Sequence, residues 1–312
     1  MTATQGSDAG AEPRVVSLIA SATEIVCGLG GEHLLVGRSH ECDYPPSIGD
    51  RPVCSHAKLD VTASSRAIDD QVKSLLRDAV SIYGLHAERI DALRPTHIIT
   101  QSQCDVCAVS LSDVEVAVCE RFDSSPDLIV LEPNAIEDVW ADIARVGHAL
   151  GIGSTDDRVA ALRRRMPDRD PASGPRVLCV EWTDPPMVAG NWVPALVRAA
   201  GGVPLLARDG VHSPYLTAEQ IAACDPEVIV FMPCGFDLPR TTEESVAVLE
   251  REPWRSLAAV RSGGVYFTDG NAYFNRPGPR VVESAEILCE IFDDHHAVSS
   301  KNRLAAWTRW SG

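Results

Sequence analysis

The chain has 312 residues, of which 45% are hydrophobic and 23% are charged, as in an ordinary globular protein. It carries 28 basic and 44 acidic residues, which gives a formal charge of −16. This excess of negative charge repels phosphate backbones and anionic lipid, so nucleic acid is excluded as an expected partner. The length exceeds that of most single hydrophobic cores and favours two domains.

Residues 1–13 are polar and acidic, and we expect them to form a disordered leader. The leader lacks the basic start, the apolar stretch and the small-residue cleavage site of a secretory signal peptide. No apolar run in the sequence approaches the roughly 20 residues needed to span a bilayer. These features predict a cytoplasmic protein without membrane insertion.

In the first half, short apolar runs alternate with segments of helical periodicity, which is typical of strand-helix-strand units and a mainly parallel sheet. A helix is expected from about Ser21 to the glycine pair Gly30-Gly31, because glycine supplies the left-handed cap beyond a helix end. Four runs are predicted strands: residues 14–20, 34–39, 96–101 and 127–131.

Residues 67–84 are predicted to form a helix of the N-terminal lobe. One apolar stripe along a helix is typical of packing against a domain, so we interpret this segment as a packing helix. The stripe consists of Ile68, Val72, Leu75, Leu76 and Ala79.

The middle of the chain is expected to connect two lobes. Helices are predicted at residues 135–150 and 156–166, followed by a linker rich in Pro, Gly and Ser at 167–175. We therefore expect an N-terminal lobe at 14–150, an interdomain helix and linker at 151–175, and a stiff connection between the lobes.

The second half repeats the pattern of the first. A helix is expected from about Val193 to Gly201-Gly202, and we place the C-terminal lobe at 176–292, with a tail at 293–312. The fold class is thus α/β, with two Rossmann-like lobes built on parallel sheets. The predicted strands are residues 176–182, 203–207, 227–232 and 264–268.

An internal repeat supports this symmetry. The stretch IDALRPTHII at residues 90–99 and the stretch IAACDPEVIV at 221–230 share one pattern. Each leads into cysteine, the first at Cys104 and Cys107 and the second at Cys234. The repeat predicts equivalent loops in two lobes that face each other across a cleft, with thiols in that cleft.

Several motifs occur in one order along the chain, and they cover roughly residues 14–292. With them the chain resembles the helical-backbone, TroA-like class of substrate-binding proteins that serve ABC importers for vitamin B12, haem and iron chelates, and most of all its B12-binding members. The matching stretches are VSLIASATE at 16–24, VGRS at 36–39, CDYPP at 42–46, LRP at 93–95, PP at 185–186, AGG at 200–202 and FNRPGPR at 274–280.

The resemblance implies two α/β lobes joined by a stiff helix, with a ligand held between them and little hinge motion. It also implies a non-enzymatic protein that binds cobalamin, another corrinoid or a related metal chelate, with components of an ABC importer as partners. Members that work outside the cytoplasm carry a signal peptide or lipid anchor, so the leader described above favours a cytosolic binding protein instead.

Ligands of open α/β sheets bind beyond the carboxyl ends of the strands, where several aromatic residues are predicted to lie. Flat rings suit the wall of a site for a planar macrocycle. The resemblance puts Tyr273 where the B12-binding relative has a tryptophan. The predicted ligand-binding residues are Tyr44, Trp182, Tyr215, Tyr273 and Arg276.

Cysteines in predicted cleft loops raise a second possibility, a zinc or iron-sulfur metalloprotein or a redox enzyme on the same fold. One CxxC pair supplies half of a tetrahedral site, and His40 or His56 could complete it in place of a thiol. A thiol could instead bind the metal of the ligand itself. The candidate metal ligands are Cys42, Cys54, Cys104, Cys107 and Cys234.

The other five cysteines lie in helix and strand patterns, and we expect them to be small buried hydrophobic side chains. No glycine-rich phosphate loop, GxSxG or HExxH motif is present in the sequence, and no catalytic residues are predicted.

Overall fold

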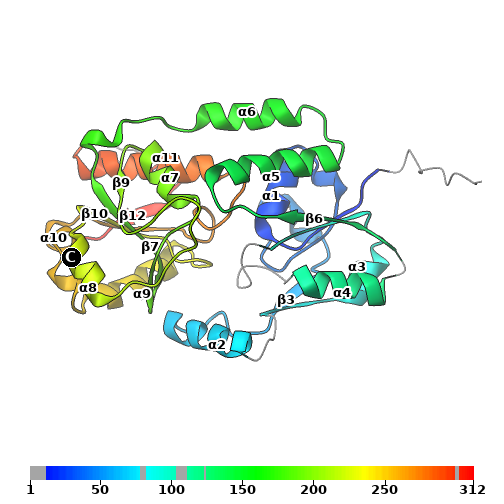
Figure 1. Ribbon diagram of the computed structural model, residues 1–312, viewed down its shortest axis with the longest axis horizontal. Coiled ribbons are helices and arrows are strands. Elements are labelled where there is room, and N and C mark those ends of the chain that lie inside the picture. Colours follow the sequence, from blue (N-terminus) through cyan, green and yellow to red (C-terminus); the bar gives the residue numbers. More distant parts are fainter. Residues whose placement is uncertain (1–11, 78–81, 103–110, 123, 299–301) are drawn as a thin grey trace, which may run out of the picture. The chain divides into compact units, whose positions relative to one another are not determined.

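The computed structural model describes residues 12–77, 82–102, 111–122, 124–298 and 302–312 (Figure 1). Contacts divide the chain into two compact units. Unit 1 comprises Met1–Lys58, Ser81–Leu131 and Val146–Gly153, and unit 2 comprises Leu59–Val80, Glu132–Arg145 and Ser154–Gly312. Within the described ranges, no helix combines the length and the hydropathy needed to cross a bilayer.

Unit 1 is built on a four-stranded parallel sheet in the order β2-β1-β5-β6. Figure 1 shows α1 on one face of the sheet and α3 and α4 on the other. The strands are β1 (Val15–Ser17), β2 (Leu35–Arg38), β5 (His97–Gln101) and β6 (Asp127–Leu131), and the helices are α1 (Ala20–Gly28), α3 (Ala87–Ala92) and α4 (Leu111–Arg121).

Shorter elements complete unit 1. The turns η1 (Glu32–Leu34) and η2 (Pro46–Asp50) flank β2, and β3 (Ser55–Ala57) pairs antiparallel with β4 (Tyr83–Leu85). The hydrophobic core of unit 1 includes Val16, Leu18, Ile90 and Ile98. All four strands predicted for the first half are confirmed, whereas Tyr83 and Gly84, at the end of the helix predicted for 67–84, belong to β4.

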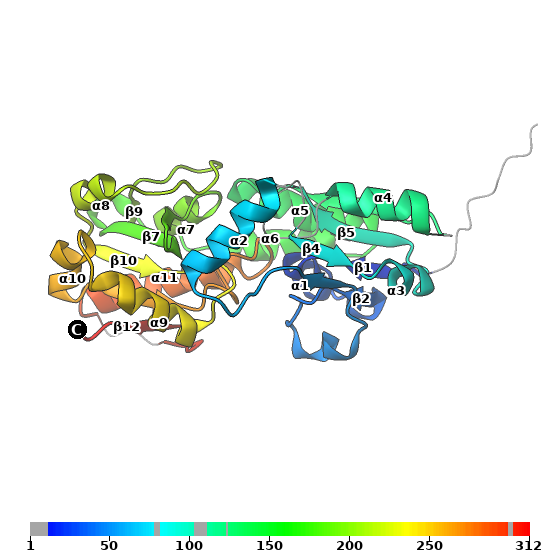
Figure 2. The same cartoon turned by 90° about the horizontal axis from the view of Figure 1, so that it is seen from below.

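Unit 2 has a six-stranded sheet in which β12-β11-β10-β7-β8 is one path and β9 pairs with β7. α7 and α11 cover one face, and α8, α9 and α10 cover the other (Figures 1 and 2). The strands are β7 (Arg176–Thr183), β8 (Pro186–Val188), β9 (Val203–Pro204), β10 (Val228–Phe231), β11 (Val265–Thr268) and β12 (Trp307–Arg309).

The remaining helices belong to unit 2, except that α5 is divided: its residues up to Arg145 belong to unit 2 and those from Val146 on belong to unit 1. The apolar stripe predicted on α5 is buried at Val139, Trp140, Ile143 and Val146. The helices are α5 (Ile136–Ala149), α6 (Thr155–Arg165), α7 (Val193–Ala199), α8 (Ala218–Cys224), α9 (Leu238–Leu249), α10 (Ala258–Ser262) and α11 (Val281–His295), with the turns η3 (Pro171–Ser173) and η4 (Trp254–Ser256).

The two sheets repeat one topology. β2-β1-β5-β6 in unit 1 corresponds to β9-β7-β10-β11 in unit 2, and all these pairs are parallel. The first helix of each sheet also ends alike, since Gly30 and Gly201 have φ values of +78° and +88°. The repeated sequence stretches therefore mark equivalent strands, β5 and β10, and the predicted α/β class with two parallel sheets is confirmed.

Two segments differ from the predicted domain boundaries. The helix α2 (Ser65–Arg77) was expected in the N-terminal lobe, but its segment groups with unit 2. Its anchors are polar, as described below, and a hydrophobic pattern does not identify them. The predicted tail contributes β12, which pairs with β11, and Trp307 is buried against it.

Asp142 of α5 is a buried carboxyl group of unit 2. Its side chain is 1% exposed, accepts a hydrogen bond from the Glu132 amide at 3.0 Å and pairs with the Arg145 guanidinium at 3.1 Å. Burial raises the pKa of Asp142 from 3.8 to about 6, and the nearby Arg145 offsets only part of this effect.

We predict that Asp142 makes the protein less stable as pH rises from about 4 to about 6, because the folded state then binds more protons than the unfolded chain. Asp142→Asn should remove this dependence, so its stability relative to the parent should improve by about 1 to 3 kcal/mol from pH 4 to pH 7. Urea unfolding at four pH values measures this, with the exposed Asp168→Asn as control. Parallel pH profiles for parent and Asp142→Asn would contradict the assignment.

Candidate functional site

Three neighbouring loops of unit 2 begin at the carboxyl ends of parallel strands. The loops follow β7, β10 and β11, and backbone hydrogen bonds connect them. The Cys234 amide donates to the Glu181 carbonyl at 3.1 Å, and the Asn271 amide donates to the Phe236 carbonyl at 3.0 Å. The first bond ties the loop after β10 to the end of β7, and the second ties it to the loop after β11, at the edge of the sheet where ligands of α/β proteins bind.

Asn275 fastens this surface further. Its side-chain amide donates to the carbonyls of Met232 and Gly270, at 2.9 Å each. The Thr268 hydroxyl donates to the Phe231 carbonyl at 3.0 Å, which joins the ends of β10 and β11. The loop carrying Tyr273 and Arg276 is therefore tied to the loop carrying Cys234.

Trp182 stands near the end of β7, as predicted. Its ring lies 5.2 Å from the ring of Phe236, with 50° between the ring planes. The Trp182 indole nitrogen is buried and finds no hydrogen-bond partner among the described residues. The side chain as a whole is half-buried, so this loop surface presents an aromatic ring together with an unsatisfied donor.

Tyr273 and Arg276 lie in the loop between β11 and α11. The Arg280 guanidinium lies over the Tyr273 ring at 5.3 Å, and the buried Arg276 donates to the Asn271 side chain at 3.1 Å. Burial raises the pKa of Asp269 in the same loop, and Arg276 and Arg280 counteract this. The loop is thus a packed polar cluster, and Arg276 contributes mainly buried contacts to it.

Tyr215 is engaged by the segment 59–77, which we call the strap. Its hydroxyl donates to the Asp69 carboxylate at 2.7 Å, and Lys73 lies over its ring at 4.6 Å. Tyr215 was predicted to bind the ligand; its hydroxyl pairs with α2, while the side chain is 47% exposed, so its role in binding stays a prediction. The long-range contact between Tyr215 and Asp69 leaves no signature in the sequence.

In unit 1 the corresponding edge carries the loop after β2. The Arg38 guanidinium donates to the carbonyls of Cys42 at 2.9 Å and Gly49 at 3.1 Å, and so shapes this loop. Tyr44 in the loop is 45% exposed. The Ser21 hydroxyl, in the first turn of α1, and the Gln101 side-chain nitrogen, at the end of β5, are buried without a partner among the described residues.

Two of the predicted metal ligands lie in the interior of unit 1. The Cys42 thiol is buried 3.0 Å from the Thr23 hydroxyl, and Cys54 belongs to the hydrophobic core around Val16 and Ile98. Burial raises the pKa of the Cys54 thiol to about 11, so the free thiol stays protonated at neutral pH. This placement corrects the expectation of a loop thiol: the residue serves as a small apolar side chain.

Three further cysteines were predicted as metal ligands, and none of them lies in the described part of unit 1. Cys234 is half-buried in unit 2, and Cys104 and Cys107 lie outside the described residues. His40 contacts the Ser55 hydroxyl at 2.8 Å, and His56 stacks on His86. Among the described side chains, no group of three His, Cys, Asp or Glu residues is arranged to hold a metal ion.

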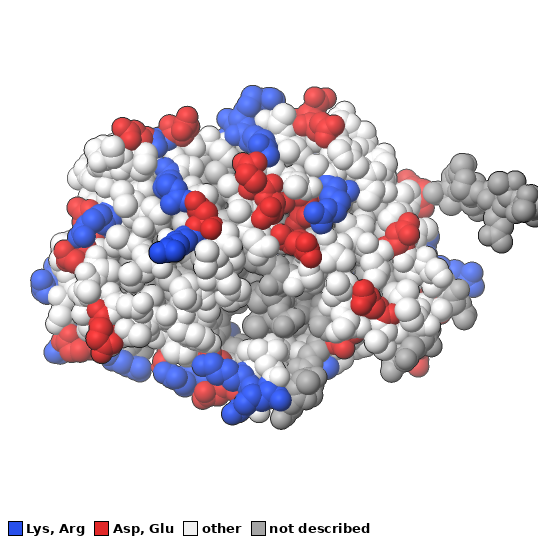
Figure 3. All heavy atoms as spheres, viewed as in Figure 1, with Lys and Arg blue, Asp and Glu red and all other residues white. Residues whose placement is uncertain are grey.

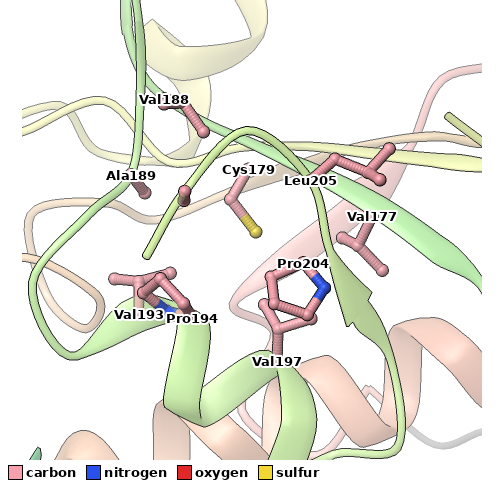
Figure 4. Close-up of a pocket in the computed structure, with 10 residues that line it drawn as sticks. Val177, Cys179, Val188, Ala189, Val193, Pro194, Val197, Pro204 and Leu205 are labelled. Atoms are coloured by element: carbon pink, nitrogen blue, oxygen red, sulfur yellow. The ribbon is translucent and has the colours of Figure 1, made fainter. Parts of the chain in front are cut away.

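A small apolar pocket in unit 2 lies apart from this edge (Figure 4). It has an empty volume of about 160 Å³, and Cys179 lines it together with Val177, Val193, Val197 and Pro204. Drug-sized ligands occupy roughly 300 to 1,000 Å³, so the pocket is too small for a macrocycle. We interpret it as imperfect packing between β7, β9 and α7.

Sequence reasoning missed two residues of the edge in unit 2. Phe236 packs on Trp182, and the Arg240 guanidinium lies 3.8 Å from the centre of the Phe236 ring. Phe236 follows Cys234 in the predicted cleft loop, so the position of this loop was the available signal. No sequence feature distinguishes Arg240, which is half-buried, from the other arginines of the chain. Basic and acidic side chains are interspersed on the face in Figure 3.

Comparison with known proteins supports the predicted resemblance. Residues 154–272 match the periplasmic binding protein family. A cobalamin-binding protein of Halobacterium salinarum is 26% identical over 284 residues, covering 89% of this chain and 69% of that protein.

Two solved structures share the fold over most of their length. One is a periplasmic haem-binding protein from Pseudomonas aeruginosa (TM-score 0.67, 19% identity, 97% of this chain and 99% of that chain). The other is a periplasmic vitamin B12-binding protein of Vibrio cholerae (TM-score 0.60, 19% identity, 91% and 98%). The predicted resemblance to this class of binding proteins is therefore confirmed.

Proposed function

Because residues 154–272 belong to the periplasmic binding protein family and the whole fold is that of such proteins, we propose that the chain is a substrate-binding protein for a metal-containing macrocycle. Its relatives bind cobalamin or haem, as their names state. The ligand we propose is cobalamin or another corrinoid. Components of an ABC importer are the partners that the family implies.

The observation that carries this proposal is the aromatic edge of unit 2. Trp182 and Phe236 form a ring pair at the carboxyl end of β7, and the Trp182 indole N–H has no partner among the described residues. A half-buried ring with a nearby donor suits the rim of a large, mostly apolar ligand that carries amide groups. A corrinoid has both an apolar ring and peripheral amides.

The charge of the chain favours a corrinoid over haem. With a formal charge of −16, the protein repels the two carboxylates of haem more than the uncharged amide side chains of cobalamin. This preference is modest at physiological ionic strength, where charges are screened over about 8 Å.

Titration of the purified protein tests the function. We expect saturable binding of cobalamin or cobinamide, measured by the absorbance of the corrin and by quenching of tryptophan fluorescence, and weaker binding of haemin. Ferric chelates complete the panel. If the titrations with all four ligands are flat, the proposed function is wrong.

The predicted cytoplasmic location stays a prediction. Cell fractionation followed by immunoblotting tests it, and recovery of the protein outside the cytoplasm would overturn it. Two proteins with this fold are periplasmic. The fractionation test does not depend on ligand binding.

A further inference from the structure

Arg240 joins two parts of unit 2 that are 179 residues apart in sequence. From the first turn of α9, its guanidinium donates to the Val61 carbonyl and the Ala63 carbonyl, at 2.6 Å each. The central carbon of the same guanidinium lies over the Phe236 ring, 3.8 Å from the ring centre. One side chain therefore contacts both the strap and the ring that packs on Trp182.

The position of Arg240 is well defined. Asp237 caps α9 by accepting a hydrogen bond from the Arg240 amide at 2.9 Å, which fixes the backbone from which the side chain extends. Two carbonyl acceptors use donors on both arms of the planar guanidinium, while its face remains on the ring. Lysine cannot make this combination of contacts, because its ammonium is a point charge without a flat face.

The strap has further polar anchors on the same edge. Arg66 pairs with Asp184, directly after β7, and the Ser65 hydroxyl donates to Glu244 of α9 at 2.9 Å. Tyr215 donates to Asp69, as described above. The helix α2 is thus fastened beside α9 and the end of β7 (Figure 2).

The strength of these anchors is modest. Arg66 is 53% exposed, and ion pairs of exposed side chains contribute about 0 to 1 kcal/mol each. The strap residues are not part of the hydrophobic core cluster of unit 2. A few polar contacts therefore hold the strap. Among the residues that make them, Arg240 also contacts the aromatic pair, at Phe236.

We propose that Arg240 is a positioning residue of the ligand site, which makes the strap part of the ligand-binding surface of unit 2. This inference rests on the proposed function. By holding the strap carbonyls on one side and the buried Phe236 ring on the other, Arg240 fixes the ring that supports Trp182, the half-buried ring that meets the ligand. Loss of Arg240 frees both the strap and the ring pair, and bound ligand then dissociates faster.

Three variants of the full chain test this inference. Arg240→Gln removes the charge and the flat face, Arg240→Lys keeps only the charge, and Arg255→Gln makes the same change at an exposed arginine that pairs with Glu252. The probes are cobalamin, cobinamide and haemin, and koff is measured by stopped flow. Limited trypsin digestion, followed by mass spectrometry of peptides ending at Arg66 and Lys73, reports on release of the strap.

We expect koff in Arg240→Gln to rise about tenfold, together with about tenfold faster cleavage of the strap. Arg240→Lys should fall between this variant and the parent, and Arg255→Gln should match the parent. If koff is unchanged in Arg240→Gln, whether or not the strap is cleaved faster, the inference is wrong while the proposed function stands. If the parent binds none of the probes, the proposed function fails and takes the inference with it.

Discussion

Gly270→Ala is expected to lower the free energy of unfolding by about 1 to 3 kcal/mol and to weaken ligand binding. Gly270 lies just after β11, and a Cβ atom there would stand 2.2 Å from the Pro233 carbonyl oxygen and 2.6 Å from the Met232 carbonyl carbon. Both contacts are with backbone, which has no flexible end to turn away. The loops after β10 and β11 must therefore separate.

The effect on binding follows from the same contacts. Asn275 holds the carbonyls of Met232 and Gly270 together, so a shift between the two loops breaks at least one of these hydrogen bonds. Phe236 lies in the displaced loop and supports Trp182. We expect a weaker Kd for cobalamin in Gly270→Ala even under conditions where the protein remains folded.

Urea unfolding and the cobalamin titration measure the two effects. Gly153→Ala is the matched control, because an added Cβ at Gly153 meets nothing within 4 Å. The control should unfold at the same urea concentration as the parent, or slightly above it. Equal midpoints for Gly270→Ala and Gly153→Ala would show that the two loops are not packed as closely as described.

The parallel strands were predictable because each is a short apolar run next to a turn or a helix pattern. The repeat around residues 90–99 and 221–230 also identified the equivalent strands β5 and β10, and the shared order of the two sheets explains it. β8 and β12 were missed for a physical reason. Each has three residues and lies at an edge of the sheet, and Thr308 and Arg309 of β12 are exposed, so little apolar pattern marks it.

The helical periodicity of the strap predicts its helix but not the unit on which that helix packs. The stripe containing Ile68 and Val72 predicted a helix and an apolar face, and the helix α2 is present. Its partner, however, is set by Arg66, Asp69 and Ser65, which form polar contacts with residues more than 100 positions away. Polar residues on a helix are usually solvated, so no pattern in the sequence assigns these residues to unit 2.

The cysteines illustrate the limit for the site. Cys42 and Cys54 lie in segments rich in polar and turn residues, which favoured loop thiols, yet both are buried. A free cysteine packs as a small hydrophobic side chain, and its sequence neighbours do not report which role it has. Trp182 was assigned to the edge because it ends a predicted strand, a signal that depends on local pattern alone.

Trp182→Ala is expected to weaken cobalamin binding by about 30-fold or more, which corresponds to ~2 kcal/mol and is typical of a central aromatic contact. The change removes both the ring that packs on Phe236 and the indole N–H that has no partner among the described residues. Trp182→Phe keeps a ring but no donor, so it should lie between Trp182→Ala and the parent. Its distance from each separates the contribution of the ring from that of the N–H.

Trp310→Ala provides the matched truncation, since Trp310 is a half-buried ring that packs on the core of unit 2 next to β12. Both truncations remove a large ring, so loss of stability alone should affect them similarly, and urea unfolding of each variant measures it. Only Trp182→Ala should lose affinity. Equal Kd values for the two variants would place the ligand away from β7, because a ring in contact with the ligand cannot be deleted without a change in binding.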